Sequence, residues 1–256
     1  MSTTIPPTPA ETAPAGLSES QRILNIFLAP SKTFEDIRRN ASWWVPWLLG
    51  SLISACFILT VDKRIGFETV VNNQMAQAPE FMKRAMERVP PEERQKSLQR
   101  QIAGQRIGAL YLGWLFYLIF SIVLAALLMF VFNFILEAGI PFKNALATWF
   151  YASLPRAVLF ALLGIVVLLI GVDPSVFDFE NPITTNLAAF LDPTTSSKFL
   201  YRLLGGIDIF AIWAVILLGM GFASQSRKKM SAATGITTIA VLYGIYVLGR
   251  AGLAAL

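Results

Sequence analysis

The sequence contains no histidine, and this absence removes several kinds of chemistry at once. Without imidazole there is no histidine general base, no Ser-His-Asp triad and no HExxH zinc site. Cys56 is the single cysteine, so neither a disulfide within the chain nor a cysteine cluster for a metal can form. The phosphate-binding motif GxxxxGK[ST] and the dinucleotide motif GxGxxG are also missing. We therefore expect no enzymatic activity and no cofactor or metal.

Charged residues are scarce as well. They make up 14% of the chain, whereas hydrophobic residues make up 55%, which is not the composition of a water-soluble domain. The net charge of +5 is explained by basic residues that flank membrane spans, and no long basic face with interleaved aromatic residues indicates nucleic-acid binding. We expect an integral protein of the cell membrane, whose first partner is the lipid bilayer.

Long apolar stretches are what the sequence does contain. A membrane-spanning helix needs about 20 apolar residues, because each residue adds about 1.5 Å and the hydrocarbon layer is about 30 Å thick. The third stretch is interrupted by Pro155 and Arg156, which predicts a kinked helix. The expected fold is an all-α polytopic membrane protein with five transmembrane helices, at about residues 43–61, 107–136, 146–172, 205–223 and 234–256.

Three polar segments lie outside these spans. Residues 1–20, rich in Pro, Thr and Ala, are expected to form a disordered tail. Residues 21–40 are expected to form two short amphipathic helices, the first begun by a capping box of Ser18 and Gln21. These helices either lie on an anionic membrane surface or pack against the bundle. Residues 62–106 are expected to form an extramembrane helical hairpin whose second helix runs on into the second span.

Basic residues near the spans indicate the orientation. Those expected at one membrane surface are Arg22, Lys32, Arg38, Arg39, Arg227, Lys228 and Lys229. The cluster at 227–229 lies in a short loop, where the bias toward the cytoplasm acts most strongly, so we expect a cytoplasmic N-terminus. The hairpin holds nine basic residues against six acidic ones and favours the opposite orientation.

Polar residues at membrane depth are the candidate functional residues, because they are costly to keep there. Asp208 and Arg250 are expected at similar depth near the ends of the last two spans, where they either form an ion pair or reach water independently. Arg156 either satisfies backbone carbonyls at a kink beside Pro155 or belongs to a polar path. Glycine residues at positions 219, 221, 235, 244 and 249 would allow close approach of helices.

Three sequence segments resemble those of a known family. "LNIFLAPSKTFEDIRRNASWWVPWLL" precedes and enters the first span, "YASLPRAV" lies in the third and contains Tyr151, and "GGIDIFAIWAVILLGMGFA" forms the fourth. In their order and spacing they are similar to bacterial members of the Yip family, the Ypt/Rab-interacting membrane proteins. The resemblance covers most of residues 20–256.

The resemblance implies a multi-pass helical protein with a cytoplasmic N-terminus. Eukaryotic relatives bind small GTPases in vesicle trafficking through a long acidic N-terminal region, but the tail of this chain is short and nearly uncharged. GTPase binding is therefore not expected. Two hypotheses follow. In the first, the protein is a non-enzymatic membrane-organising scaffold that binds other membrane proteins or itself; in the second, it is a transporter or channel component whose path is lined by Arg156, Asp208 and Arg250.

Overall fold

The computed structural model describes residues 16–78, 80–179, 181–183, 185–192 and 195–255. Within them the chain forms α-helices and two 3₁₀ turns, and the sole extended pairing is one isolated bridge. The elements in chain order are α1 (Glu19–Leu28), α2 (Pro30–Arg39), α3 (Trp44–Arg64), α4 (Phe67–Ala76), α5 (Glu80–Glu87), α6 (Pro91–Tyr111), α7 (Gly113–Ile135), α8 (Phe142–Ile170), η1 (Pro174–Val176), η2 (Leu187–Phe190), α9 (Lys198–Gly205), α10 (Ile209–Gln225) and α11 (Ala232–Ala255).

Four of these helices, α3, α7, α8 and α11, are long and apolar enough to cross a membrane. The predicted fourth span corresponds to α10, which is apolar but has 17 residues, or about 25 Å of helix. The expected all-helical polytopic membrane protein is confirmed. The shorter α10 reflects Asp208, whose side chain caps the helix and starts it later than the apolar run at residue 205 predicts.

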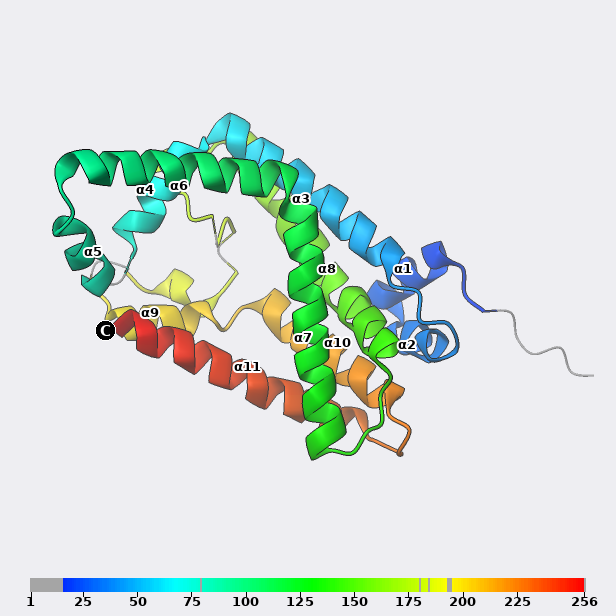
Figure 1. Cartoon of the computed structure of the whole chain (residues 1–256). Coiled ribbons are helices and arrows are strands. Elements are labelled where there is room, and N and C mark those ends of the chain that lie inside the picture. The colour runs from blue at the N-terminus through cyan, green and yellow to red at the C-terminus, as the bar shows by residue number, and fades with distance from the viewer. Residues whose placement is uncertain (1–15, 79, 180, 184, 193–194, 256) are drawn as a thin grey trace, which may run out of the picture.

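The segment before the second span differs from the expected hairpin. It forms three helices, α4, α5 and α6, which we call the arm. The chain turns sharply between α6 and α7 (Figure 1), so α6 does not continue into the span, which begins at Gly113 and not at 107. Glycines at 108 and 113 weaken the helix at this point. The break allows Trp114 to pack against Trp47 of α3, with 6.2 Å between ring centroids.

Helix α8 is the centre of the bundle and contacts α1, α2, α3, α7 and α10. Its first half is almost entirely buried, including Phe150, Tyr151 and Leu154, each 0% exposed. The helix continues through Pro155 to Ile170, and its second half leaves Leu162, among others, exposed. The buried first half therefore holds the bundle together, while the second half offers one face to lipid.

Helices α10 and α11 meet at their backbones. A Cβ atom added to Gly235 would lie 2.2 Å from the carbonyl oxygen of Gly219, which leaves no room for a side chain. Gly221 is also tightly enclosed, by Thr148 and Phe34, whereas Gly244 and Gly249 have open space. Three of the five glycines singled out in the sequence thus serve close packing.

Helices α1 and α2 close one end of the bundle (Figure 1). Ser18 and Gln21 form the predicted capping box at the start of α1. The Nε2 of Gln225, at the end of α10, donates to the carbonyl of Phe34 on α2 at 2.8 Å. The segment therefore packs against the bundle, which is the second of the two alternatives. Glu19 and Ser20 already belong to α1, and residues 1–15 of the expected tail lie outside the described residues.

Arg22 corrects the expected set of membrane-surface residues. Its side chain is 2% exposed, with Nε 2.5 Å from Oδ2 of Asp36 and NH1 3.2 Å from Oε1 of Glu19. Burial acts to lower the pKa of the guanidinium, but the hydrogen bond with Asp36 opposes it and the net pKa is raised. Arg22 turns inward because two acidic residues of α1 and α2 supply its counter-charges.

The remaining residues of that set are exposed at the end of the bundle closed by α1 and α2, here called the basic end. The backbone N–H of Arg227 donates to the carbonyl of Ala138 at 2.8 Å, so the α7–α8 and α10–α11 loops lie together. Lys228 also pairs with Glu137, and this lowers the pKa of that carboxyl. The exposed basic residues are Lys32, Arg38, Arg39, Arg227, Lys228 and Lys229.

Candidate functional site

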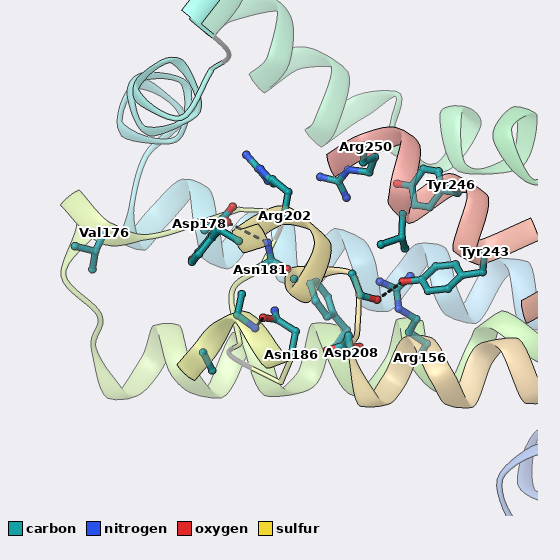
Figure 2. Close-up of a pocket in the computed structure, with 17 residues that line it drawn as sticks. Arg156, Val176, Asp178, Asn181, Asn186, Arg202, Asp208, Tyr243, Tyr246 and Arg250 are labelled. Carbon is teal, nitrogen blue, oxygen red and sulfur yellow. Dashed lines mark hydrogen bonds between the residues drawn. The ribbon is translucent and has the colours of Figure 1, made fainter. Parts of the chain in front are cut away.

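A polar pocket of about 270 Å³ is lined by residues of α8, α9 and α11, of the loop before α9 and of the turn that ends at Asp208, the N-cap of α10 (Figure 2). Its walls come from segments that are far apart in the sequence, and they are rich in Arg, Tyr and Asn. The lining residues used below are Arg156, Asp178, Asn181, Asn186, Tyr201, Arg202, Gly206, Asp208, Tyr243, Tyr246, Val247 and Arg250.

Asp208 lines the pocket at the point where α10 begins. Its Oδ1 accepts hydrogen bonds from the N–H groups of Phe210 and Ala211, at 3.0 and 2.9 Å. These are orphan donors of a helix N-terminus, where a negative charge also suits the helix dipole. Its Oδ2 accepts a hydrogen bond from the hydroxyl of Thr185. Asp208 is therefore partnered by its own helix and by the preceding loop.

The loop before α9 is fastened to the start of α10 by a short antiparallel pairing. The N–H of Leu187 donates to Ile207 at 3.2 Å, and the N–H of Ile209 donates to Thr185 at 3.3 Å. This places Asn186 opposite Asp208. Irregular backbone in a membrane protein has to be paired within the protein or face a polar cavity, and this loop does both.

Arg156 enters the pocket from the middle of α8. Figure 2 shows its guanidinium beside Tyr243 of α11. The hydroxyl of Tyr243 donates to the carbonyl of Gly206 at 2.8 Å and so ties α11 to the turn before α10. A Cβ atom on Gly206 would lie 2.5 Å from a methyl group of Val247, so this turn rests directly on α11. This part of the pocket wall is thus fixed in place.

Arg202 of α9 and Arg250 of α11 lie on the side of the pocket opposite Arg156 (Figure 2). The guanidinium carbon of Arg250 is 5.9 Å from the ring centre of Tyr246, within the range of a cation–π contact. Among the described lining residues the three arginines face two carboxylates, Asp178 and Asp208.

The arm reaches this side of the molecule through α5. Nζ of Lys198, the first residue of α9, is 2.7 Å from Oε1 of Glu80, which also pairs with Lys83 at 3.4 Å. The hydrogen bond with Lys198 has the larger effect, and together with the bond to Lys83 it lowers the pKa of the Glu80 carboxyl. Helix α9, which supplies Arg202 to the pocket, is thereby tied to the arm.

The structure brings together Arg156, Asp208 and Arg250, the three charged residues that the sequence indicates as candidates. Within the described residues no ion pair joins Asp208 to Arg250, because the carboxylate oxygens of Asp208 are occupied by Thr185 and α10. Tyr151 lies elsewhere: its hydroxyl donates to Glu19 of α1, which also pairs with Arg22. Pro155 is buried in α8 and does not line the pocket.

Sequence reasoning missed Arg202, Tyr243 and Tyr246. A signal for the tyrosines is present, because Tyr243, Tyr246 and Arg250 are spaced i, i+3 and i+7 and so share one face of α11. Arg202 has no such signal, because the sequence does not indicate where a short helix between two loops lies relative to the bundle. Among the described residues no group of acidic or cysteine side chains is placed to hold a metal ion.

Comparison with known families agrees with the resemblance seen in the sequence. The Yip1 domain model matches residues 24–250, which is nearly the whole chain. Neither curated proteins nor solved structures give a significant match. The matched region includes α3, α7, α8 and α10, together with α11 up to Arg250 at the pocket. The chain is a multi-pass membrane protein that belongs to the Yip1 domain family.

Proposed function

We propose that this protein acts as a non-enzymatic membrane-organising scaffold, which binds lipid and other membrane proteins. The observation that carries the proposal is that Arg156, Asp208 and Arg250, the charged residues expected at membrane depth, all line one pocket. The described core cluster of the bundle is formed by apolar side chains such as Leu154, Leu217 and Phe222, each at most 2% exposed. A binding site needs one opening, whereas a conduit needs a polar lining that continues across the bundle.

Exposed helix faces support the scaffold. Helix α7 leaves large apolar side chains exposed along its length, including Trp114, Phe120 and Phe134, and α11 does the same. In a membrane these faces meet lipid, another membrane protein or a second copy of the chain. Their partners are proposed to lie within the bilayer and not to be cytoplasmic GTPases.

A transporter or channel component remains the second candidate, and one observation favours it. Arg156, Asp208 and Arg250 converge where α10 is shortened and irregular backbone lines a cavity. Shortened helices whose ends face a polar site are typical of transporter binding sites. In this candidate the pocket would hold a solute in transit.

Flux measurements separate the two candidates. Purified protein in liposomes is tested for chloride, phosphate and potassium flux, with empty liposomes and an Arg156→Gln variant alongside. The scaffold predicts the same leak in all three preparations. A protein-dependent flux that the variant abolishes, while the variant remains inserted and folded, would establish the transporter instead.

A positive test of the scaffold uses photo-crosslinking in native membranes. A photoreactive amino acid is placed at Phe120 or Phe134 on the exposed face of α7, with a matched probe at the buried Phe132. The scaffold predicts a discrete protein adduct, of a partner or a second copy, from the exposed positions alone. Adducts with lipid only, at both exposed positions, would contradict protein binding by this face.

A further inference from the structure

The pocket holds a charge that the described chain does not neutralise. Arg156 lies in the middle of an apolar helix, where a charged side chain is costly unless it is paired or hydrated. Within the described residues Arg156 makes no ion pair or hydrogen bond. It lines the cavity together with two further arginines, Arg202 and Arg250. The nearby carboxylate of Asp208 is occupied by Thr185 and by the start of α10.

From this geometry we propose that the pocket binds a phosphate group, with Arg156 as the residue that recognises it. A guanidinium presents a planar fork of N–H donors that matches two phosphate oxygens. The rest of the lining is compatible with the same ligand, because the hydroxyl groups of Tyr201 and Tyr246 can donate hydrogen bonds. The proposal rests on the assignment of this pocket as a binding site and names its ligand class.

The size of the pocket limits the ligand. A volume of about 270 Å³ is just below the range of roughly 300–1,000 Å³ typical of small-molecule sites. It admits a phosphate with a small attached group, and the rest of a larger ligand would have to lie outside the pocket. Either free phosphate or the headgroup of an anionic phospholipid carries this chemistry.

The surroundings of the pocket suit a phospholipid. Ile209, Ile212 and Ile216, which follow Asp208, are 64%, 47% and 38% exposed and recur on one face of α10. Ile245 and Leu248 of α11, beside Tyr246 and Val247 of the lining, are 63% and 55% exposed. Acyl chains of a lipid whose headgroup lies in the pocket would meet apolar surface directly outside it.

Titration calorimetry on the full-length protein in detergent tests the proposal. Short-chain phosphatidylglycerol, short-chain phosphatidylcholine and inorganic phosphate are titrated separately into the wild type, Arg156→Gln, Arg156→Lys and Arg84→Gln. Arg84 is exposed on α5 and does not line the pocket, so its variant controls for a general loss of positive charge. We expect Arg156→Gln to weaken binding roughly 10- to 100-fold, as for a lost charge-assisted hydrogen bond, and Arg84→Gln to leave it unchanged.

The titrations distinguish the two sources of phosphate. Tighter binding of phosphatidylglycerol than of inorganic phosphate and phosphatidylcholine identifies a lipid headgroup, whereas equal binding of phosphatidylglycerol and phosphate identifies a free anion. Arg156→Lys keeps the charge but loses the planar set of guanidinium donors, so its affinity should lie between those of the wild type and Arg156→Gln. If Arg156→Gln does not fold, the comparison of Arg156→Lys with the wild type provides the test. Wild-type affinity in a folded Arg156 variant, or no binding of any phosphate compound to the wild type, would overturn the proposal. Because no flux is measured, this result is independent of the choice between scaffold and transporter.

Discussion

Two buried or membrane-embedded arginines of this protein have opposite surroundings. Arg22 lies between Asp36 and Glu19, so its charge is compensated by the first two helices. Arg156 lines a pocket and makes no ion pair with another described residue. The same residue type therefore fastens an element in one place and is available to an external anion in the other.

At the residue scale, we predict that Arg22→Met destabilises the protein by about 3–5 kcal/mol. Methionine keeps much of the side-chain length, but the substitution leaves the carboxylate of Asp36 buried without its partner. Lys32→Met, an exposed basic residue on α2, is the matched control and should change the stability little. Thermal unfolding in detergent measures both.

The same prediction has an internal check. A double variant, Arg22→Met with Asp36→Leu, removes both charges and should regain much of the lost stability, since an apolar pair can replace a buried ion pair. If Arg22→Met is as stable as Lys32→Met, then the ion pair does not stabilise the packing of α1 against α2.

The sequence could identify these charged residues but not their partners. The apolar runs placed Arg156, Asp208 and Arg250 at membrane depth, and the structure brings all three into one pocket. The sequence could not decide whether Asp208 and Arg250 form an ion pair, because the actual partner of Asp208 is Thr185, which lies in a loop without a periodic pattern. Contacts made through such loops depend on tertiary structure that no local spacing encodes.

At the element scale, the contact between α10 and α11 depends on glycine at particular positions. Gly235 and Gly244 both lie in α11, but a Cβ atom fits only at Gly244, where nothing lies within 4 Å. We expect Gly235→Ala to push the helices apart and destabilise the protein by roughly 1–3 kcal/mol, the usual cost of overpacking. Gly244→Ala should be neutral or stabilise the helix by up to about 1 kcal/mol.

The two alanine variants are compared by thermal unfolding in one detergent. Because they add the same methyl group to the same helix, a difference between them reports the environment and not the helix propensity. Equal unfolding temperatures would show that α10 and α11 are not packed backbone to backbone in the protein in solution.

Helix identity could be predicted at this scale, whereas helix boundaries could not. Apolar periodicity and the Ser18 capping box indicated the type of most elements. The break at Leu112 was missed because Gly108 and Gly113 only weaken the helix there, and the contact of Trp114 with Trp47 on another helix, which favours the turn, is not visible in the sequence. The start of α10 was misplaced because residues 205–207 are apolar but belong to α9 and its turn.

At the scale of the whole molecule, the question is whether the short α10 completes a crossing. The hydrogen bond from Arg227 to Ala138 places the end of α10 on the same side as the loop before α8. Figure 1 likewise shows α1 and α2 at the end of the molecule opposite the C-terminus. A helix of about 25 Å is shorter than the hydrocarbon layer of about 30 Å, so we expect the residues before α10 to occupy the remaining depth if α10 crosses.

Thiol labelling in intact cells tests this arrangement together with the predicted cytoplasmic N-terminus. Single cysteines are placed at Gln99 on α6 and at Lys229 after α10, both exposed, in a Cys56→Ala background. Three of the five expected crossings, α7, α8 and α10, lie between the two positions, so the two cysteines should be on opposite sides of the membrane. We expect an impermeant reagent to label Gln99→Cys directly and Lys229→Cys only after permeabilisation, because the basic end should face the cytoplasm.

The inverted pattern would place the basic end outside and make the arm cytoplasmic, as its own nine basic residues favour. Labelling of both positions from outside would mean that α10 does not cross, and the pocket would then lie at a membrane surface, open to soluble anions.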